Sequence, residues 1–201
     1  MVSRRFFIGP NVWPSLPETD FKQPVNAYFG AIYDLTVKLI EIIAQTLPYG
    51  PAIFNDFVKN DPVTPLRLLH YPPQKLGDEE QLGASAHTDF GAITLLLQDE
   101  NAGLEVLNME TNQWMLVPPK DDTFVVNIGD MLAMWTDGLY KSSVHRVLNR
   151  SHNDRYSVAF FFDGNLDCRL DPLNGSKVDG PSFTCEEYMI RRMTETYGGG
   201  K

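Results

Sequence analysis

Cysteine is scarce in this sequence. The 201 residues include two cysteines, Cys168 and Cys185, and neither lies in a CxxC pair or in another spacing typical of a metal site. The sequence therefore predicts no disulfide framework and no cysteine-bound metal. We expect both thiols to occupy ordinary packed or exposed positions.

Basic residues are also few. Lys and Arg number 17 against 26 Asp and Glu, which gives a formal net charge of −9 and a sequence pI of about 4.8. The basic clusters are the pairs Arg4-Arg5 and Arg191-Arg192, and such pairs are typical of a solvated surface. Because nucleic-acid binding requires a basic patch, we expect no nucleic-acid partner.

Long hydrophobic runs are missing as well. The basic N-terminus is not followed by the apolar core of a signal peptide. No apolar run approaches the length of about 20 residues that a membrane-spanning helix needs. These absences predict a cytoplasmic protein without a membrane partner.

The sequence does contain enough apolar material for a globular core, with 43% hydrophobic residues and three Trp. No repeat or linker divides it, so we predict one domain over residues 1–201. Its core, about 60–165, holds many short β-type runs separated by turn signals, which favours a mainly β sandwich or barrel with flanking helices. We predict strands near 66–71, 84–89, 92–98, 104–108, 113–117, 123–128, 131–135, 144–149 and 156–163, with 167–170 as a further candidate.

Two helices are predicted to flank this core. Apolar residues recur at three- and four-residue steps over 24–47, with Pro24 at the start and Pro48 beyond the end, which indicates an amphipathic helix. The segment 52–58 is a candidate for a second, shorter helix. A C-terminal helix over about 185–196 follows Thr184 and Glu187, which have the spacing of a capping box.

The most informative motif is His87-Thr88-Asp89, next to a strongly β-type run. Side chains at i and i+2 of a strand point to the same face, so His87 and Asp89 are expected to reach into one space while Thr88 points away. An imidazole and a carboxylate are two of the three ligands of the facial triad in non-haem iron oxygenases. His145, on a later β-type run, is a candidate for the third.

A second pair has the same spacing. Arg155 and Ser157 lie on one face of a predicted strand and offer a planar fork of donors and a hydroxyl. This pair suits a carboxylate held inside a β-barrel, where an unpaired charge would be costly. Either pair alone is more often an ordinary surface pair, and the order and spacing of all three motifs make the signal specific.

These motifs resemble the isopenicillin N synthase-like family of iron(II)/2-oxoglutarate dioxygenases. The resemblance is close over about 60–165 and looser over the flanking helices. Supporting segments are 66–73, 103–106, 126–130 and 145–147. It implies a double-stranded β-helix, or jelly-roll, core. It also implies that the usual N-terminal region of the family is absent from this chain, which would leave a sheet edge open.

The resemblance assigns roles to particular residues. His87, Asp89 and His145 match the iron ligands. Arg155, Ser157 and Tyr71 match the residues that bind the distal carboxylate of 2-oxoglutarate, and Phe161 lies near an aromatic substrate contact, with its neighbours Phe160 and Phe162 as alternatives. Leu69 stands where relatives often have Asn, which removes one polar contact. No catalytic residue beyond the metal centre is implied.

The implied reaction consumes iron-bound 2-oxoglutarate and dioxygen and oxidises a small organic metabolite by hydroxylation or desaturation, with succinate and carbon dioxide as co-products. Two alternatives remain open. One is an iron oxidase of the same fold that uses no 2-oxoglutarate, in which the Arg155 and Ser157 pair binds another anion. The other is a truncated, non-catalytic iron-binding relative. The sequence leaves the substrate and the oligomeric state open.

Overall fold

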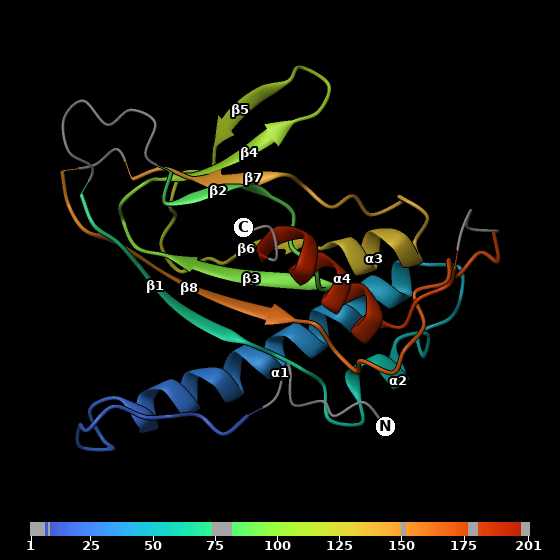
Figure 1. The fold of residues 1–201 in the computed structure, drawn as a ribbon, viewed down its shortest axis with the longest axis horizontal. Helices are drawn as coiled ribbons and strands as arrows, with labels where there is room; N and C mark the ends of the chain where they lie inside the picture. The colour runs from blue at the N-terminus through green and yellow to red at the C-terminus, as the bar shows by residue number, and fades with distance from the viewer. Residues whose placement is uncertain (1–6, 8, 74–81, 150–151, 177–180, 198–201) are drawn as a thin grey trace.

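Two antiparallel sheets face each other in the computed structural model, which describes residues 7, 9–73, 82–149, 152–176 and 181–197 (Figure 1). Within these residues, the larger sheet has the strand order β1-β8-β3-β6 and the smaller one β2-β7-β4-β5. Strands adjacent in a sheet come from distant parts of the sequence, as expected for a jelly roll. The strands are β1 (Leu66–Tyr71), β2 (Ala84–His87), β3 (Ile93–Gln98), β4 (Leu104–Asn108), β5 (Gln113–Leu116), β6 (Val125–Ile128), β7 (His145–Val147) and β8 (Arg155–Phe162).

The two faces of the larger sheet have different environments because side chains alternate along each strand. On β8, Phe160 and Phe162 are fully buried on the outer face, whereas Ser157 and Phe161 line a cavity between the sheets. On β1, Tyr71 lines the same cavity. The larger sheet therefore has an apolar outer face that packs on α1 and an inner face that lines the cavity.

Helix α1 (Lys22–Thr46) covers the outer face of the larger sheet, below it in Figure 1. Its buried residues are spaced by four, which places them on one stripe of the helix, and include Ile32 and Ile40. The Phe29 ring meets Phe160 edge-on with centroids 5.6 Å apart. The helix predicted over 24–47 is thus confirmed with its ends shifted by one or two residues.

The prediction of a strand at 131–135 is wrong. These residues belong to helix α3 (Asp130–Trp135), which starts directly after Gly129. Met131, Leu132 and Trp135 are the buried residues of this helix, a helical spacing that the sequence analysis read as a short β-type run. Short apolar runs of this kind are ambiguous because tertiary packing, and not local pattern, decides between helix and strand.

The other short elements follow the predictions more closely. Helix α2 (Asn55–Val58) lies within the candidate segment 52–58, and helix α4 (Cys185–Tyr197) matches the predicted C-terminal helix. The capping box is confirmed: the amide of Glu187 donates to Thr184 Oγ1, and the amide of Thr184 donates to Glu187 Oε2. The candidate strand 167–170 is reduced to a single bridge between Arg169 and Thr184.

None of the helices in the described part of the chain combines the length and the apolar character needed to cross a membrane.

Candidate active site

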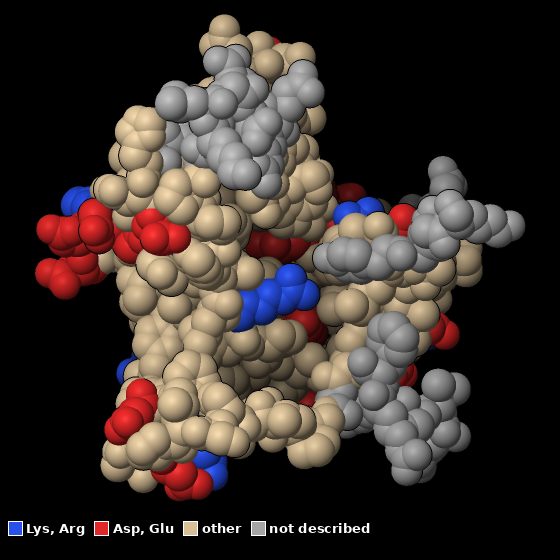
Figure 2. Space-filling view, turned by 60° about the vertical axis from the view of Figure 1, so that its left-hand side comes forward, with Lys and Arg blue, Asp and Glu red and all other residues tan. Residues whose placement is uncertain are grey.

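A cavity of about 340 Å³ lies between the two sheets and is lined by inward-facing side chains of both. His87, Asp89 and His145 line one part of it, and Tyr71 and Arg155 line another. Figure 2 shows the molecule hollowed on one face, with a basic side chain across the hollow and acidic atoms visible behind it. The strand alternation therefore brings all the predicted motifs into one space.

The structure brings the predicted triad together. One nitrogen of His87, one oxygen of Asp89 and one nitrogen of His145 all lie within 4.8 Å of one another. His145 Nε2 is 3.7 Å from Asp89 Oδ1, and the two imidazole rings have centroids 4.3 Å apart. β2 pairs with β7 so that His87 faces His145 across the ladder, which explains why residues far apart in sequence meet.

Each of these side chains is oriented by a second contact. His87 Nδ1 donates to the carbonyl of Ser85 at 2.6 Å, and His145 Nδ1 donates to the carbonyl of Ser143 at 3.0 Å. These bonds select the tautomer that leaves both Nε2 lone pairs free. Asn127 Nδ2 donates to Asp89 Oδ2 at 2.6 Å. Two imidazoles and a carboxylate, each held by a second hydrogen bond, fit the facial triad of a ferrous centre.

At the other part of the cavity, Arg155 carries a buried guanidinium with one free donor. Its side chain is 0% exposed. Nε donates to the carbonyl of Asn101 at 3.1 Å and Nη2 donates to Gln98 Oε1 at 2.9 Å, while Nη1 has no partner among the described residues. The guanidinium carbon lies 5.0 Å from the centre of the Tyr71 ring. Burial lowers the pKa of this guanidinium from its ordinary value, an effect partly opposed by Tyr71. An unpaired buried donor of this kind fits a carboxylate ligand.

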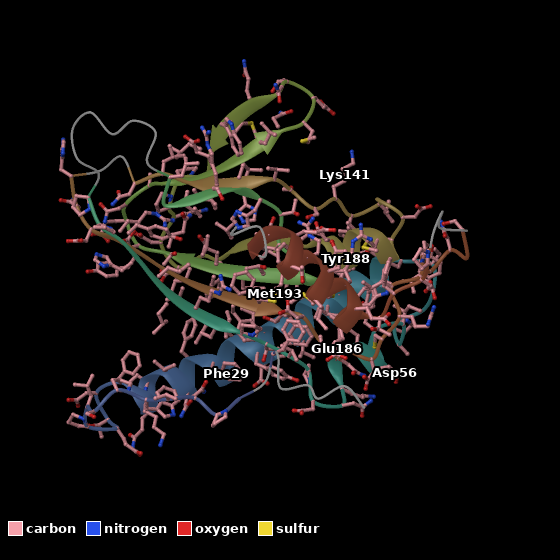
Figure 3. The ribbon with its side chains drawn as sticks, viewed as in Figure 1. Phe29, Asp56, Lys141, Glu186, Tyr188 and Met193 are labelled. Carbon is pink, nitrogen blue, oxygen red and sulfur yellow. The ribbon has the colours of Figure 1, made fainter. Side chains whose placement is uncertain are left out.

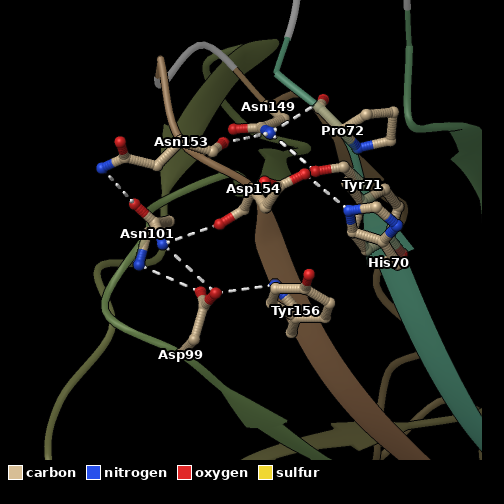
Figure 4. Close-up of polar contacts among 9 residues, drawn as sticks. All are labelled: His70, Tyr71, Pro72, Asp99, Asn101, Asn149, Asn153, Asp154 and Tyr156. Carbon is tan, nitrogen blue, oxygen red and sulfur yellow. Dashed lines mark hydrogen bonds and ion pairs between the residues drawn. The ribbon is translucent and has the colours of Figure 1, made fainter.

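The chain around Arg155 is fixed by a polar network (Figure 4). Asn101 Nδ2 donates to Asp99 Oδ2 and to the carbonyl of Asp154, and the amide of Tyr156 donates to Asp99 Oδ2 at 2.6 Å. Asn149 Nδ2 donates to three backbone carbonyls, those of Tyr71, Pro72 and Asn153. These contacts anchor the start of β8, so the guanidinium is held in place before any ligand binds.

A glycine makes room for the same group. A Cβ on Gly103 would lie 2.9 Å from Arg155 Nε and 2.6 Å from the carbonyl oxygen of Leu148. Only glycine allows this close approach. Gly103 begins the segment 103–106 that supports the family resemblance, and this clash gives a physical reason for glycine at that position.

The remaining predicted site residues differ in whether they face the cavity or the core. Ser157 and Phe161 line the cavity, whereas Phe160 and Phe162 are buried in the core on the opposite face of β8. Leu69 lines the cavity, so the position that often carries Asn in relatives is apolar here.

Arg67 was not among the predicted site residues. It lines the cavity and its guanidinium carbon lies 5.5 Å from the centre of the Phe161 ring. The signal was present, because Arg67, Leu69 and Tyr71 share one face of a strand by the alternation rule. Gln98 and Asn127 were also missed, and their roles depend on which strands become neighbours.

Comparison with known proteins places this site in a family. The family model for the 2OG-Fe(II) oxygenase superfamily matches residues 62–164, about half of the chain. The chain belongs to this superfamily. The matched residues run from just before β1 to just after β8 and so include every strand of both sheets.

Individual members of the superfamily are similar over nearly the whole chain. The 2-oxoglutarate-dependent dioxygenase citB of Monascus ruber is 53% identical over 98% of this chain and 63% of that protein. Clavatol oxidase claD of Penicillium crustosum is 47% identical over 96% of this chain and 60% of that protein. The crystal structure of a full-length Neurospora crassa protein in complex with alpha-KG and thymine superimposes with a TM-score of 0.84 at 32% identity, covering 94% of this chain and 61% of that one.

These matches confirm the predicted family, its jelly-roll fold, and iron(II) and 2-oxoglutarate as the metal and co-substrate of the family. The chain spans about three fifths of the length of these relatives.

Proposed function

We propose that this chain carries the active site of an iron(II)- and 2-oxoglutarate-dependent oxygenase that oxidises a small organic molecule. The observation that carries the proposal is the pairing of two features in one cavity. Three ligand atoms converge within 4.8 Å at one end, and a buried Arg155 with an unpaired Nη1 lies at the other. A ligand that chelates a metal and ends in a carboxylate matches both features.

At the metal end, His87, Asp89 and His145 would hold the iron. The Ser85 and Ser143 carbonyls keep the Nδ1 protons on the imidazoles, so the Nε2 atoms are the ligands. With three ligands from the protein, a bound iron would still accept co-substrates. When bound, the iron supplies the oxidising chemistry, with 2-oxoglutarate and dioxygen consumed and succinate and carbon dioxide released.

At the other end, Arg155 binds the distal carboxylate of 2-oxoglutarate. Its Nη1 is the free donor, and the nearby Ser157 hydroxyl and Tyr71 add neutral polar contacts in the same part of the cavity. Because Nε and Nη2 are already engaged by Asn101 and Gln98, the guanidinium need not reorganise when the carboxylate arrives.

The substrate contacts Arg67 and Phe161. Both line the cavity, and Arg67 is exposed toward solvent while Tyr71, on the same strand, is buried. A guanidinium over an aromatic ring favours a flat substrate with an anionic or hydrogen-bond-accepting group. The small molecules named for relatives, clavatol for the Penicillium crustosum oxidase and thymine for the Neurospora crassa structure, support a substrate of this size.

We also propose that residues 1–201 act as one catalytic domain. One hydrophobic core joins the helices to the larger sheet. It contains Ile40 of α1, Phe160 of β8 and Met189 of α4.

Anaerobic titration of iron(II) and 2-oxoglutarate tests the proposal. We expect the weak visible charge-transfer band of the chelate, and we expect Arg155→Ala to need roughly 100-fold more 2-oxoglutarate, the equivalent of one or two lost charge-assisted hydrogen bonds. Arg155→Lys serves as the control that retains the charge. Iron binding without the band would favour the oxidase alternative, and absence of iron binding would contradict the metal site.

A further inference from the structure

Helix α4 contacts the metal-ligand segment from outside the barrel. His87 and Asp89 line the cavity, whereas the alternating residues Thr88 and Phe90 face the other way and meet α4. Arg192 Nη2 donates to Thr88 Oγ1 at 3.2 Å, and its guanidinium carbon lies 4.7 Å from the centre of the Phe90 ring. The residues on each side of Asp89 are therefore contacted by one side chain of a helix about 100 residues away along the chain.

Asp130, the first residue of α3, joins these contacts. Its Oδ2 accepts hydrogen bonds from Thr88 Oγ1 at 3.0 Å and from Tyr188 OH at 2.8 Å, and Arg192 Nη2 lies 3.6 Å away. Tyr188 and Arg192 are four residues apart, so they lie on the same face of α4. In Figure 3, Tyr188 lies on the side of α4 toward α3 and Glu186 lies on another side.

The junction between β6 and α3, residues 129–130, also hydrogen-bonds the backbone of the metal-ligand segment. The amide of Asp130 donates to the carbonyl of Asp89 at 2.8 Å, and the amide of Gly129 donates to the carbonyl of Ala92 at 2.9 Å. A Cβ on Gly129 would lie 2.2 Å from the carbonyl oxygen of Gly91, so the two chain segments are as close as glycine allows. Any shift of Asp130 is therefore transmitted directly to the residue whose carboxylate faces the histidines.

We propose that Tyr188 and Arg192 are positioning residues for the metal site: through Asp130, Thr88 and Phe90 they hold Asp89 in its metal-binding geometry, so docking of α4 and metal binding stabilise each other. The inference rests on the proposed metal site. The coupling is reciprocal by thermodynamic necessity: if a docked α4 tightens metal binding, bound metal stabilises the docked α4. Contacts behind a ligand typically change metal affinity by about 10- to 100-fold.

The variants Tyr188→Phe and Arg192→Gln test whether the α4 contacts strengthen metal binding. Tyr188→Phe removes one hydroxyl, and Arg192→Gln removes the cation next to Asp130. Arg191→Gln is the matched control, because it makes the same change one residue earlier, where Arg191 pairs with Glu195 in an exposed ion pair. We expect Mn(II), used as the redox-stable probe and titrated by electron paramagnetic resonance, to bind about tenfold more weakly to Tyr188→Phe and Arg192→Gln and within twofold of wild type to Arg191→Gln.

Hydrogen exchange tests whether bound metal stabilises the docked α4, first in the wild-type protein and then in the two arginine variants. Amides of 185–197 are expected to exchange more slowly with Mn(II) bound, and this protection is expected to shrink in Arg192→Gln and to persist in Arg191→Gln. Unchanged α4 exchange on metal binding, together with Mn(II) affinities within twofold of wild type in both test variants, would overturn the inference and leave the metal site standing. A wild-type protein that takes up no Mn(II) would instead contradict the proposed function itself.

Discussion

The two ends of the cavity bury charge of opposite sign. Near the triad, the buried carboxylate of Asp89 lines the cavity. A second buried carboxylate, Asp163, is not among the lining residues, and burial, followed by the charge of Asp89, raises its pKa to about 7. At the other end Arg155 is fully buried, and burial lowers the pKa of its guanidinium. Without ligands each end carries a desolvation cost. This arrangement of charge suits a cation at one end of the cavity and a carboxylate at the other.

The two ends are also held differently. Arg155 is fixed by Gln98 and Asn101, which lie on or next to β3, the direct neighbour of β8 in the sheet. Asp89 is fixed by Asn127 and by the corner that joins β6 to α3, with α4 behind it. We therefore expect a change at the metal end to alter Mn(II) affinity measured without 2-oxoglutarate, and a change at the Arg155 end to alter the 2-oxoglutarate affinity of the metal-loaded protein.

The largest effect is expected from Asp89→Ala. This variant removes a proposed metal ligand, so Mn(II) affinity should fall by more than the roughly 100-fold upper range for contacts behind a ligand. Isothermal titration of Mn(II) measures it. The folded state should persist, because removing a buried carboxylate also removes charge repulsion with Asp163. Retention of wild-type Mn(II) affinity would show that the metal lies elsewhere.

Asp163→Asn is expected to stabilise the metal-free protein relative to wild type as the pH rises toward 7. The folded-state pKa of Asp163, about 7, lies above its ordinary value of 3.8, so the folded state retains a proton that the unfolded state loses. The contribution of Asp163 to the free energy of unfolding therefore falls as the pH rises from about 4 to 7, by up to a few kcal/mol. Above about pH 7 this contribution no longer changes. Asn mimics the protonated acid.

Thermal unfolding from pH 5 to pH 8 checks this prediction. The midpoint of Asp163→Asn should rise relative to wild type as the pH increases to about 7, and the gap should then stay level. Added Mn(II) should narrow the gap, because a bound cation offsets the charge of Asp89, one cause of the raised pKa. A gap that is independent of pH would mean that Asp163 is ionised throughout.

A smaller and more selective effect is expected from Asn127→Ala. The variant removes the hydrogen bond to Asp89 Oδ2 and leaves the carboxylate free to rotate, so Mn(II) should bind about tenfold more weakly. The concentration of 2-oxoglutarate needed to saturate the metal-loaded protein should stay within about twofold, because the guanidinium of Arg155 is held by Gln98 and Asn101 instead. If Asn127→Ala weakened Mn(II) and 2-oxoglutarate binding equally, the two ends of the cavity would not be held by separate contacts.

The candidate site residues could be placed together from the sequence because their placement follows a local rule. His87 with Asp89, and Arg155 with Ser157, share strand faces by the alternation of side chains alone. The residues that orient them could not be predicted in the same way. Asn127 reaches Asp89 only because β6 pairs with β3, and Arg192 reaches Thr88 only because α4 packs on this corner. Such contacts depend on strand order and helix docking, the same tertiary information that was missing when 131–135 was assigned to a strand.

The smallest effect is expected from Gln98→Ala. The change leaves Nη2 of Arg155 without its acceptor, while the bond from Nε to the Asn101 carbonyl remains. The guanidinium stays in place but can turn about that remaining bond, so 2-oxoglutarate should bind about three- to tenfold more weakly, the value of one ordinary hydrogen bond. Mn(II) affinity measured without 2-oxoglutarate should not change. Gln98→Glu sharpens the comparison: the added carboxylate offers the guanidinium an internal counter-ion, so it should weaken 2-oxoglutarate binding more than Ala does. If the Gln98→Glu variant instead binds 2-oxoglutarate with wild-type affinity, Arg155 does not contact the distal carboxylate.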